Sequence, residues 1–476
     1  MSTTGFKIGY CPTRRFVFSK EDAHFYKEET LKKIESFGFE VVDLEGINEE
    51  GLLYDNYTDI QKVVKRFKEN EVDAIFIPHC NFGTENSVSE VARAIGKPTL
   101  LWGPRDEMPL PDGSRLRDSQ CGLFATGKVL RRFNVPYSYI PNCRLGDEVF
   151  ERGFRNFVAA ANVVKAFNNI KILQIGPRPA GFWSVIVNEG ELLEKFGIKL
   201  FPISIKDIEI ATLEIEKDNS EQMNETILAL KSIMDCRGAT ENQIKRIAAL
   251  KIAIQNIVEY EKCTGVAIQC WTSLQDSLGI MPCMSMGLLA EIGIPVGCET
   301  DIHGTISMIL AQAALFGEKV PFLADVTVRH PENDNAELLF HCGPMAPSLV
   351  KKGKIPALEH HHILPSNCCG TCDFEIEGGD ITIIRFDGDH GEYELFVGEA
   401  KGIEGPFIKG NYLWFEVDNW LKWEEILVTG PFIHHVAGIH GKIAPILYEA
   451  CKYIPSLKPR HASPSEDIIR DWLRGQ

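Results

Sequence analysis

Residues 294–328 read IPVGCETDIHGTISMILAQAALFGEKVPFLADVTV, and this stretch decides the fold that we expect. It contains two short apolar runs, each typical of a buried strand, separated by the apolar helical segment GTISMILAQAALFG (304–317). Each apolar run ends on an acid, Glu299 in the first and Asp325 in the second. A strand, a helix of crossover length and another strand predict a parallel β/α unit. Both acids would then lie at the carboxyl edge of the sheet, where α/β proteins bind their ligands.

The closeness of the two acids predicts a metal ion. Neighbouring strands lie about 5 Å apart, so two carboxylates there would repel, and one would take up a proton. A divalent cation removes the conflict and makes both acids ligands. A helix cap or a chance strand end would explain one such acid better than a metal does, but the pair favours the metal. His434, His435 and His440 in TGPFIHHVAGIHG (429–441) can supply an imidazole, and oxygen ligands with one nitrogen suit Mn²⁺ better than structural zinc.

The rest of the chain predicts three domains. From Phe6 to about Asn168, short apolar runs alternate with amphipathic helical stretches, as in parallel β/α units. A second series of this kind begins at IKILQIG (170–176). Beyond about Val328, apolar and polar residues alternate between Gly and Asp turns, which predicts antiparallel β structure. We therefore predict two tandem α/β (Rossmann-like, parallel-sheet) domains followed by a C-terminal antiparallel β domain. Their bounds are 1–168, 169–327, which carries the metal-site acids, and 328–476, which is β-barrel-like with a terminal helix.

Composition narrows the class of protein. The chain of 476 residues carries a net charge of -16 and no long basic block, which argues against a nucleic-acid or anionic-membrane partner. We find no apolar run long enough to span a bilayer and no signal pattern at the start, so we expect a cytoplasmic protein. The 14 cysteines are then expected to be reduced, buried thiols. Cys369 and Cys372 form one C-x-x-C pair without a second pair at zinc-ribbon spacing, so we interpret them as structural thiols.

Four motifs resemble those of the L-fucose isomerase and L-arabinose isomerase group of metal-dependent ketol isomerases. They are CETD (298–301), LADV (323–326), LFHCG (339–343) and IHHVAG (433–438). Weaker similarities lie in IGYCPTRR (8–15) and in HCNFGTEN (79–86). The resemblance thus extends over nearly the whole chain, and it implies the same fold of two α/β domains and a C-terminal β domain.

The resemblance also implies the site residues. It implies that Glu299, Asp325 and His435 bind Mn²⁺, with His434 as the alternative to His435. It implies catalytic proton transfer by Glu299 and Asp325. The residues expected to bind substrate are Gln269 and Trp271 in AIQCWTS (267–273), His341, His434, Arg14 and Asn81. Arabinose isomerases carry a further metal ligand at the position of His341, whereas fucose isomerases lack a histidine there, so coordination by His341 stays open.

The expected function is that of an Mn²⁺-dependent aldose–ketose isomerase acting on a free monosaccharide similar to L-fucose or D-arabinose. The resemblance implies proton transfer through a cis-enediol and a homo-oligomer, a hexamer or a trimer-based assembly. Arg14 and Asn81 would then reach the site of a neighbouring subunit. Three alternatives remain open: an isomerase for another sugar such as sulfoquinovose or L-arabinose, a non-catalytic sugar-binding protein, and a metal-dependent hydrolase. A sugar-binding protein would not need Glu299, Asp325 and His435 to converge.

Overall fold

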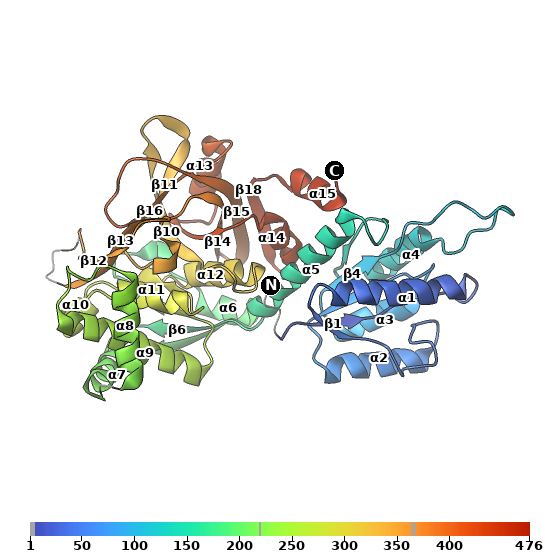
Figure 1. Ribbon diagram of the computed structural model, residues 1–476, viewed down its shortest axis with the longest axis horizontal. Coiled ribbons are helices and arrows are strands. Elements are labelled where there is room, and N and C mark those ends of the chain that lie inside the picture. The colour runs from blue at the N-terminus through green and yellow to red at the C-terminus, as the bar shows by residue number, and fades with distance from the viewer. Residues whose placement is uncertain (1–4, 219, 363, 365–367) are drawn as a thin grey trace. The chain divides into compact units, whose positions relative to one another are not determined.

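The computed structural model describes residues 5–218, 220–362, 364 and 368–476 (Figure 1). It divides into two compact units. Unit 1 comprises Met1–Lys165, Pro445–Ile454 and Glu466–Gln476, and unit 2 comprises Ala166–Ala444 and Pro455–Ser465. Within the described ranges, no helix combines the length and the apolar character needed to cross a membrane.

Unit 1 is built on a parallel sheet. In the part of it that the structure describes, the strand order is β2-β1-β3-β4-β5. The central strand β3 has the sequence AIFIP and is buried at every position, as expected for a parallel strand covered on both faces. The strands are β1 (Lys7–Tyr10), β2 (Glu40–Val42), β3 (Ala74–Pro78), β4 (Thr99–Trp102) and β5 (Ser138–Tyr139). The helices are α1 (Lys20–Glu35), α2 (Tyr57–Glu69), α3 (Glu85–Ile95), α4 (Ser119–Arg132), α5 (Glu148–Phe167), α14 (Ala444–Cys451) and α15 (Glu466–Arg474).

Unit 2 begins with a second parallel sheet, in the order β7-β6-β8-β9. Its longest helix, α9, starts at a capping box in which Thr240 and Gln243 satisfy each other's backbone N–H groups. The strands are β6 (Lys171–Ile175), β7 (Lys199–Ile203), β8 (Gly265–Ile268) and β9 (Val296–Gly297). The helices are η1 (Trp183–Val185), α6 (Glu189–Phe196), α7 (Ile205–Asp218), α8 (Glu221–Ile233), α9 (Glu241–Glu261), α10 (Ser273–Leu278), α11 (Cys283–Glu291), η2 (Cys298–Thr300) and α12 (Ile302–Ala314).

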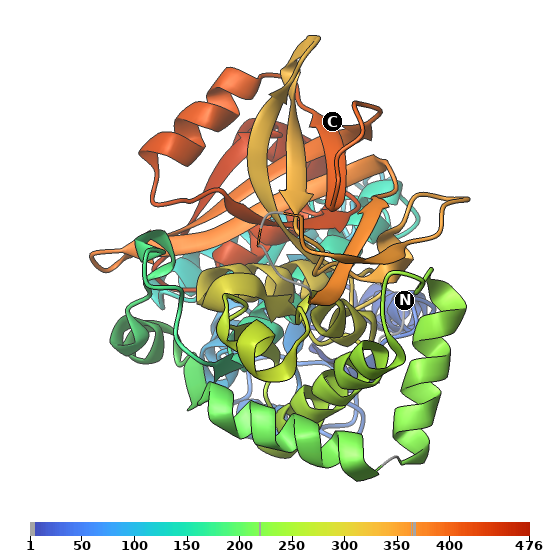
Figure 2. The ribbon, with the colours of Figure 1, turned by 90° about the vertical axis from the view of Figure 1, so that its left-hand side faces the viewer.

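The rest of unit 2 is a mostly antiparallel sheet of order β12-β13-β16-β11-β10-β17-β14-β15-β18 in the described residues. Strand β15 also pairs with β16, so the strands from β16 to β15 close into a ring. Helix α12 packs against β8 on one side and against β14 and β17 on the other, and so joins the two sheets of unit 2 (Figure 2). The elements are β10 (Phe322–His330), β11 (Asn333–His341), η3 (Pro347–Leu349), β12 (Ala357–His360), β13 (Cys369–Glu375), β14 (Gly379–Asp389), β15 (Glu392–Ile403), β16 (Asn411–Glu416), α13 (Trp420–Thr429), β17 (His435–His440) and β18 (Leu457–Ser463).

The predicted fold class, parallel-sheet α/β domains followed by an antiparallel β domain, is confirmed. One detail of the prediction is wrong. Strand β10 does not lie parallel to β9 in one sheet; it pairs antiparallel with β11 and β17. Asp325 therefore lies within β10 and not at the end of a parallel strand. The physical reason is that β9 is an edge strand, and the chain after α12 finds two antiparallel neighbours in the other sheet.

Candidate metal centre

Three side chains from three elements of unit 2 converge. Glu299 lies in η2, directly after β9, Asp325 lies on β10, and His435 begins β17. The Nε2 atom of His435 lies 3.2 Å from Oε2 of Glu299 and 3.5 Å from Oδ1 of Asp325. Asp325 and His435 are also direct partners in the register of β10 and β17, and residues paired in this way present their side chains on the same face of the sheet. The fold thus brings the three predicted ligands together, although through two sheets and not one.

The backbone at Glu299 is strained. Its φ is 57° and its ψ is 25°, the left-handed region, which costs a non-glycine residue about 1–2 kcal/mol. Both neighbours on the C-terminal side are anchored. The hydroxyl of Thr300 donates to the carbonyl of Pro177 at 3.2 Å, and Asp301 caps α12 by accepting from the N–H of Gly304 at 2.9 Å. Strain that surrounding contacts maintain is typical of functional sites.

A buried network of charged residues contacts the Nδ1 side of His435, opposite to the Nε2 atom that faces the acids. Oδ2 of Asp301 accepts a hydrogen bond from Nδ1 of His435 at 2.9 Å and from Nη1 of Arg385 at 2.5 Å. Asp301 and Arg385 are both 0% exposed. Arg385 also donates to Asp387 at 2.8 Å, and the other oxygen of Asp387 lies 2.7 Å from Nδ1 of His303. Because Asp301 holds the proton on Nδ1, it directs Nε2 of His435 toward Glu299 and Asp325.

The charges of this network explain the protonation of its members. Burial by itself would lower the pKa of His435, but the hydrogen bonds to Asp301 and Glu299 raise that pKa to about 10. Burial would likewise raise the pKa of Asp301, yet Arg385 and His435 hold it well below its usual range. Without a metal, His435 is therefore an imidazolium between acids. A divalent cation would displace that proton and take over its charge.

Buried atoms in the site that lack a hydrogen-bond partner also fit a metal. Among the described residues, Oδ1 of Asp325 and Nε2 of His341 are buried and have no hydrogen-bond partner, which ordinarily costs about 1–3 kcal/mol each. The same acids also raise the pKa of His341. Burial would lower this pKa, but Cys342, Asp325 and Glu299 raise it to about 9. Two carboxylates and an imidazole suit Mn²⁺ and similar hard cations. The residues present thus fit the ion, and His341 is positioned as a further ligand or as a substrate contact.

The other predicted residues of unit 2 lie around this centre. His434 is exposed, and its ring nitrogen, an oxygen of Asp325 and a nitrogen of His435 lie within 4.8 Å of one another. Gln269 follows β8 and donates to the carbonyl of Trp271 at 3.0 Å. The ring of Trp271 packs edge-on against Phe182, with 5.4 Å between centroids. Substrate binding by Gln269 and Trp271 stays a prediction.

Arg14 and Asn81 lie in unit 1 and have local partners there. Arg14 forms two hydrogen bonds with the carboxylate of Glu50, at 2.5 Å and 2.9 Å. The side-chain oxygen of Asn81 accepts from the N–H groups of Arg15 and Gly83, at 2.7 Å and 3.2 Å. These contacts give both residues a role in the loops that follow β1 and β3. Their predicted contact with substrate stays a prediction.

The sequence analysis assigned no role to Asp301, Arg385, Asp387 or His303. Two signals could have found part of the network. Asp301 stands three residues before Gly304 at the start of an apolar helix, which is a helix-capping pattern. Arg385 stands in the apolar strand sequence ITIIRFDG, and a charge in a buried strand needs a buried partner. Neither pattern by itself predicts that the partner also orients a metal ligand.

Comparison with known proteins gives one matching family model and two similar proteins. Residues 9–168 match the family described as fucose/sulfoquinovose isomerase, N-terminal domain. The sulfoquinovose isomerase of Priestia aryabhattai is 26% identical over 402 residues, which cover 84% of this chain and 86% of that protein. The sulfoquinovose isomerase of Alkalicoccus urumqiensis is 26% identical over 337 residues, which cover 70% of this chain and 73% of that protein.

Proposed function

We propose that this chain is an aldose–ketose isomerase of the fucose isomerase-like family, and that it uses Mn²⁺ and acts on sulfoquinovose. The observation that carries the proposal is the convergence of Glu299, Asp325 and His435, in which a buried oxygen of Asp325 has no hydrogen-bond partner among the described residues. The names of the relatives support sulfoquinovose over L-fucose or D-arabinose. The same names also favour an isomerase over a sugar-binding protein or a hydrolase.

Glu299, Asp325 and His435 would hold the ion, with His341 or His434 available as a further ligand. When bound, the ion would acidify the proton on the carbon next to the sugar carbonyl as a Lewis acid. Asp301 and Arg385 keep His435 in the tautomer that can ligate. To bind the ion, His435 would have to give up its imidazolium proton to solvent, so metal loading would release a proton.

The two acids would also carry out the proton transfer. One carboxylate removes the proton from C2 of the aldose and returns it to C1, while the other moves the hydroxyl proton between O1 and O2. Because the reaction is reversible, Glu299 and Asp325 exchange these roles with direction. The side-chain amide of Gln269, at the end of the neighbouring strand β8, would bind a sugar hydroxyl. The partly exposed ring of Trp271 would cover an apolar face of the sugar.

Arg178 is our candidate for binding the sulfonate. It follows β6 by three residues and therefore lies at the same edge of the sheet as Glu299. The preceding residue, Pro177, accepts the hydrogen bond from Thr300. The guanidinium donates to two backbone carbonyls, at 3.1 Å and 3.0 Å, and no acid of the described residues pairs with it at salt-bridge distance. A guanidinium can donate two parallel hydrogen bonds to a sulfonate, as it does to phosphate.

The test compares sulfoquinovose with quinovose, the same sugar without the sulfonate, in chelator-treated protein reloaded with Mn²⁺. We expect ketose from sulfoquinovose, with a kcat/KM about 10²-fold above that for quinovose if two charge-assisted hydrogen bonds are lost. Arg178→Met should remove most of this preference, and Arg178→Lys should restore part of it. Equal rates on both sugars would contradict the sulfonate assignment alone. Absence of ketose from every aldose and divalent ion tried, including L-fucose, D-arabinose and L-arabinose, would contradict the isomerase itself.

We also propose a cytoplasmic homo-oligomer, hexameric or trimer-based, in which Arg14 and Asn81 reach a neighbour's centre. All 14 cysteines lie among the described residues and none of them forms a disulfide there, which supports the compartment. The composite site is tested by mixing an Arg14→Ala subunit with an Asp325→Asn subunit. Recovered activity in mixed oligomers supports an active site shared between subunits. Activity that does not recover in oligomers shown to contain both subunits contradicts it.

A further inference from the structure

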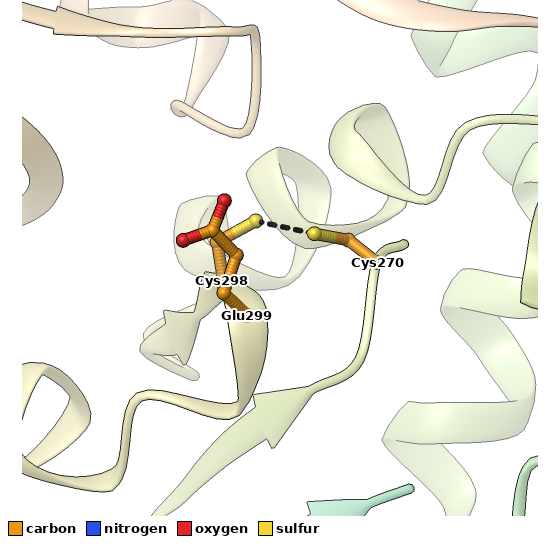
Figure 3. A group of neighbouring side chains, drawn as sticks. All are labelled: Cys270, Cys298 and Glu299. Atoms are coloured by element: carbon orange, nitrogen blue, oxygen red, sulfur yellow. Dashed lines mark hydrogen bonds between the residues drawn. The ribbon is translucent and has the colours of Figure 1, made fainter. Parts of the chain in front are cut away.

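Two buried thiols and a carboxylate gather beside the metal centre (Figure 3). Cys270 follows β8, and Cys298 follows β9, the neighbouring parallel strand. The thiol of Cys298 donates to the sulfur of Cys270 at 3.1 Å. Cys270 is 3% exposed, Cys298 is 0% exposed and Glu299 is 7% exposed. The two sulfurs and one carboxylate oxygen of Glu299 all lie within 4.8 Å of one another.

The backbone explains why consecutive residues serve one site. In an extended strand, Cys298 and Glu299 would point to opposite faces. The left-handed conformation of Glu299, with φ 57°, breaks that alternation where β9 ends. Figure 3 shows Cys270 directed toward Cys298 from a separate segment of the chain. The ligand atoms are therefore contributed by two strand ends whose spacing the sheet fixes.

We propose that Cys270, Cys298 and Glu299 form a second metal site, which binds a thiophilic ion of the Zn²⁺ type. Two thiolates and one carboxylate match the preferences of Zn²⁺ and Cd²⁺, whereas Mn²⁺ prefers oxygen ligands. Three protein ligands leave the fourth tetrahedral position to water. Zn–S bonds of about 2.3 Å require about 3.8 Å between two tetrahedral sulfurs, so the thiols need to separate by roughly 0.7 Å. Binding releases the two thiol protons to solvent and changes no oxidation state.

The second site shares Glu299 with the first. An ion held by Cys270 and Cys298 withdraws this carboxylate from Asp325 and His435, so the two ions exclude each other and zinc inhibits the isomerase. The exclusion rests on the proposed function, because it requires that Glu299 binds the hard ion. The thiolate site does not depend on it.

Cd²⁺ is the probe for the experiment. Metal-free full-length protein, kept reduced by a non-thiol reductant, is titrated with Cd²⁺ while the ultraviolet thiolate-to-Cd²⁺ charge-transfer band is recorded. We expect the band to reach its full height at one equivalent and to be absent from C270S/C298S. The matched control is C369S/C372S, which removes two other buried thiols of unit 2 and should keep the band. A band that persists at full height in C270S/C298S overturns the site.

Two further measurements keep the test decisive if the double variant folds poorly. Cys270→Ala and Cys298→Ala each remove one thiolate and should lower the band by about half. X-ray absorption of the wild-type Zn²⁺ protein should show two sulfur ligands, and a sulfur-free shell overturns the proposal. Saturating Mn²⁺ should raise the Cd²⁺ concentration at which half of the band appears, because Mn²⁺ competes for Glu299, and an unchanged midpoint overturns the sharing of Glu299. Lack of isomerase activity would overturn the proposed function while the Cd²⁺ band remained.

Discussion

Asp301→Asn tests how the buried network serves the metal centre. The substitution keeps the size of the side chain and removes its charge. Asp301 accepts from both His435 and Arg385, so the amide can satisfy only part of both contacts. Its NH₂ group can also turn toward His435 and favour the tautomer with the proton on Nε2. That proton would face Glu299 and Asp325, where the ion belongs.

The expected magnitudes come from the contacts. Loss of a carboxylate that orients a histidine ligand typically lowers metal affinity 10- to 100-fold, which is about 1.4–2.7 kcal/mol. Arg385 is 0% exposed and, within the described part of the chain, keeps only Asp387 as a charged partner. Breaking a buried ion pair from one side costs about 3–5 kcal/mol, and the amide offsets part of this by still accepting a hydrogen bond. We therefore expect a loss of stability of about 2–4 kcal/mol together with the loss of affinity.

Asp387→Asn is the matched control. Asp387 bonds the same arginine, at 2.8 Å, and is also buried, but it pairs with His303 and not with His435. The control should lose comparable stability and keep its Mn²⁺ affinity within about twofold. Mn²⁺ dissociation constants come from calorimetric titration of metal-free protein at one pH, and stabilities come from denaturant unfolding. The orienting role would be refuted if wild type and Asp301→Asn bound Mn²⁺ with equal affinity. It would also be refuted if Asp301→Asn and Asp387→Asn lost equal amounts of Mn²⁺ affinity.

In the metal-free proteins, the free energy of unfolding should depend on pH. The pKa of His435 is raised in the folded protein to about 10 from about 6.5 in an unfolded chain. A raised pKa contributes stability that is complete below pH 6.5 and disappears as the pH rises through 10. Asp301 supplies part of this contribution. The pKa of Asp301 is itself lowered in the folded protein, so its contribution is complete only above about pH 4. The difference in unfolding free energy between wild type and Asp301→Asn should therefore be largest between about pH 4 and pH 6.5 and shrink toward pH 10. A difference that grows from pH 6.5 to pH 10 would contradict this.

Three other outcomes are expected. Glu299→Gln and Asp325→Asn should each lower turnover about 10²- to 10⁴-fold even with excess Mn²⁺, and near-normal rates would contradict their acid–base roles. In heavy water the wild-type enzyme should place deuterium on C1 of the ketose, whereas complete retention of the original hydrogen over many turnovers would favour a hydride shift. Burial alone would raise the pKa of Glu50, but Arg14 and Lys20 lower it to about 2. Glu50→Gln should therefore cost about 1–2 kcal/mol at pH 6, after screening by solvent, and this cost should disappear as the pH falls from 4 to 2 in acid-unfolding measurements.

The part of the fold that could be predicted is the part with local patterns. Strand β3, AIFIP, is apolar at every position because both faces of its sheet are covered. The same reasoning gave the wrong partner for β10, because only the first part of this strand is buried, whereas residues 327–329 are exposed, as in a sheet with one open face. The hairpin turn at Pro331 and Glu332, between β10 and β11, is the signal that β10 has an antiparallel neighbour.

In the candidate site, too, local patterns in the sequence predicted individual residues but not the contacts between them. Glu299 was found because a strand ends next to it, and His435 because two histidines stand together after a turn. The approach of His435 to Asp325 depends on the register of β10 against β17, which the sequence does not state. Asp301 and Arg385 are 84 residues apart and form a buried ion pair. Such long-range pairs follow from packing and not from any pattern within one segment.

Helix α12 joins the two sheets of unit 2, and the candidate ligands are divided between those sheets, with Glu299 after β9 and Asp325 and His435 on β10 and β17. An ion held by all three would therefore link two layers that also contact each other through α9, α11 and α12. Its contribution to their association would grow with the logarithm of the free metal concentration. When metal is scarce, the two layers would separate before either layer unfolds. The protein would then be cleaved faster by proteases, and its catalytic rate would fall as well.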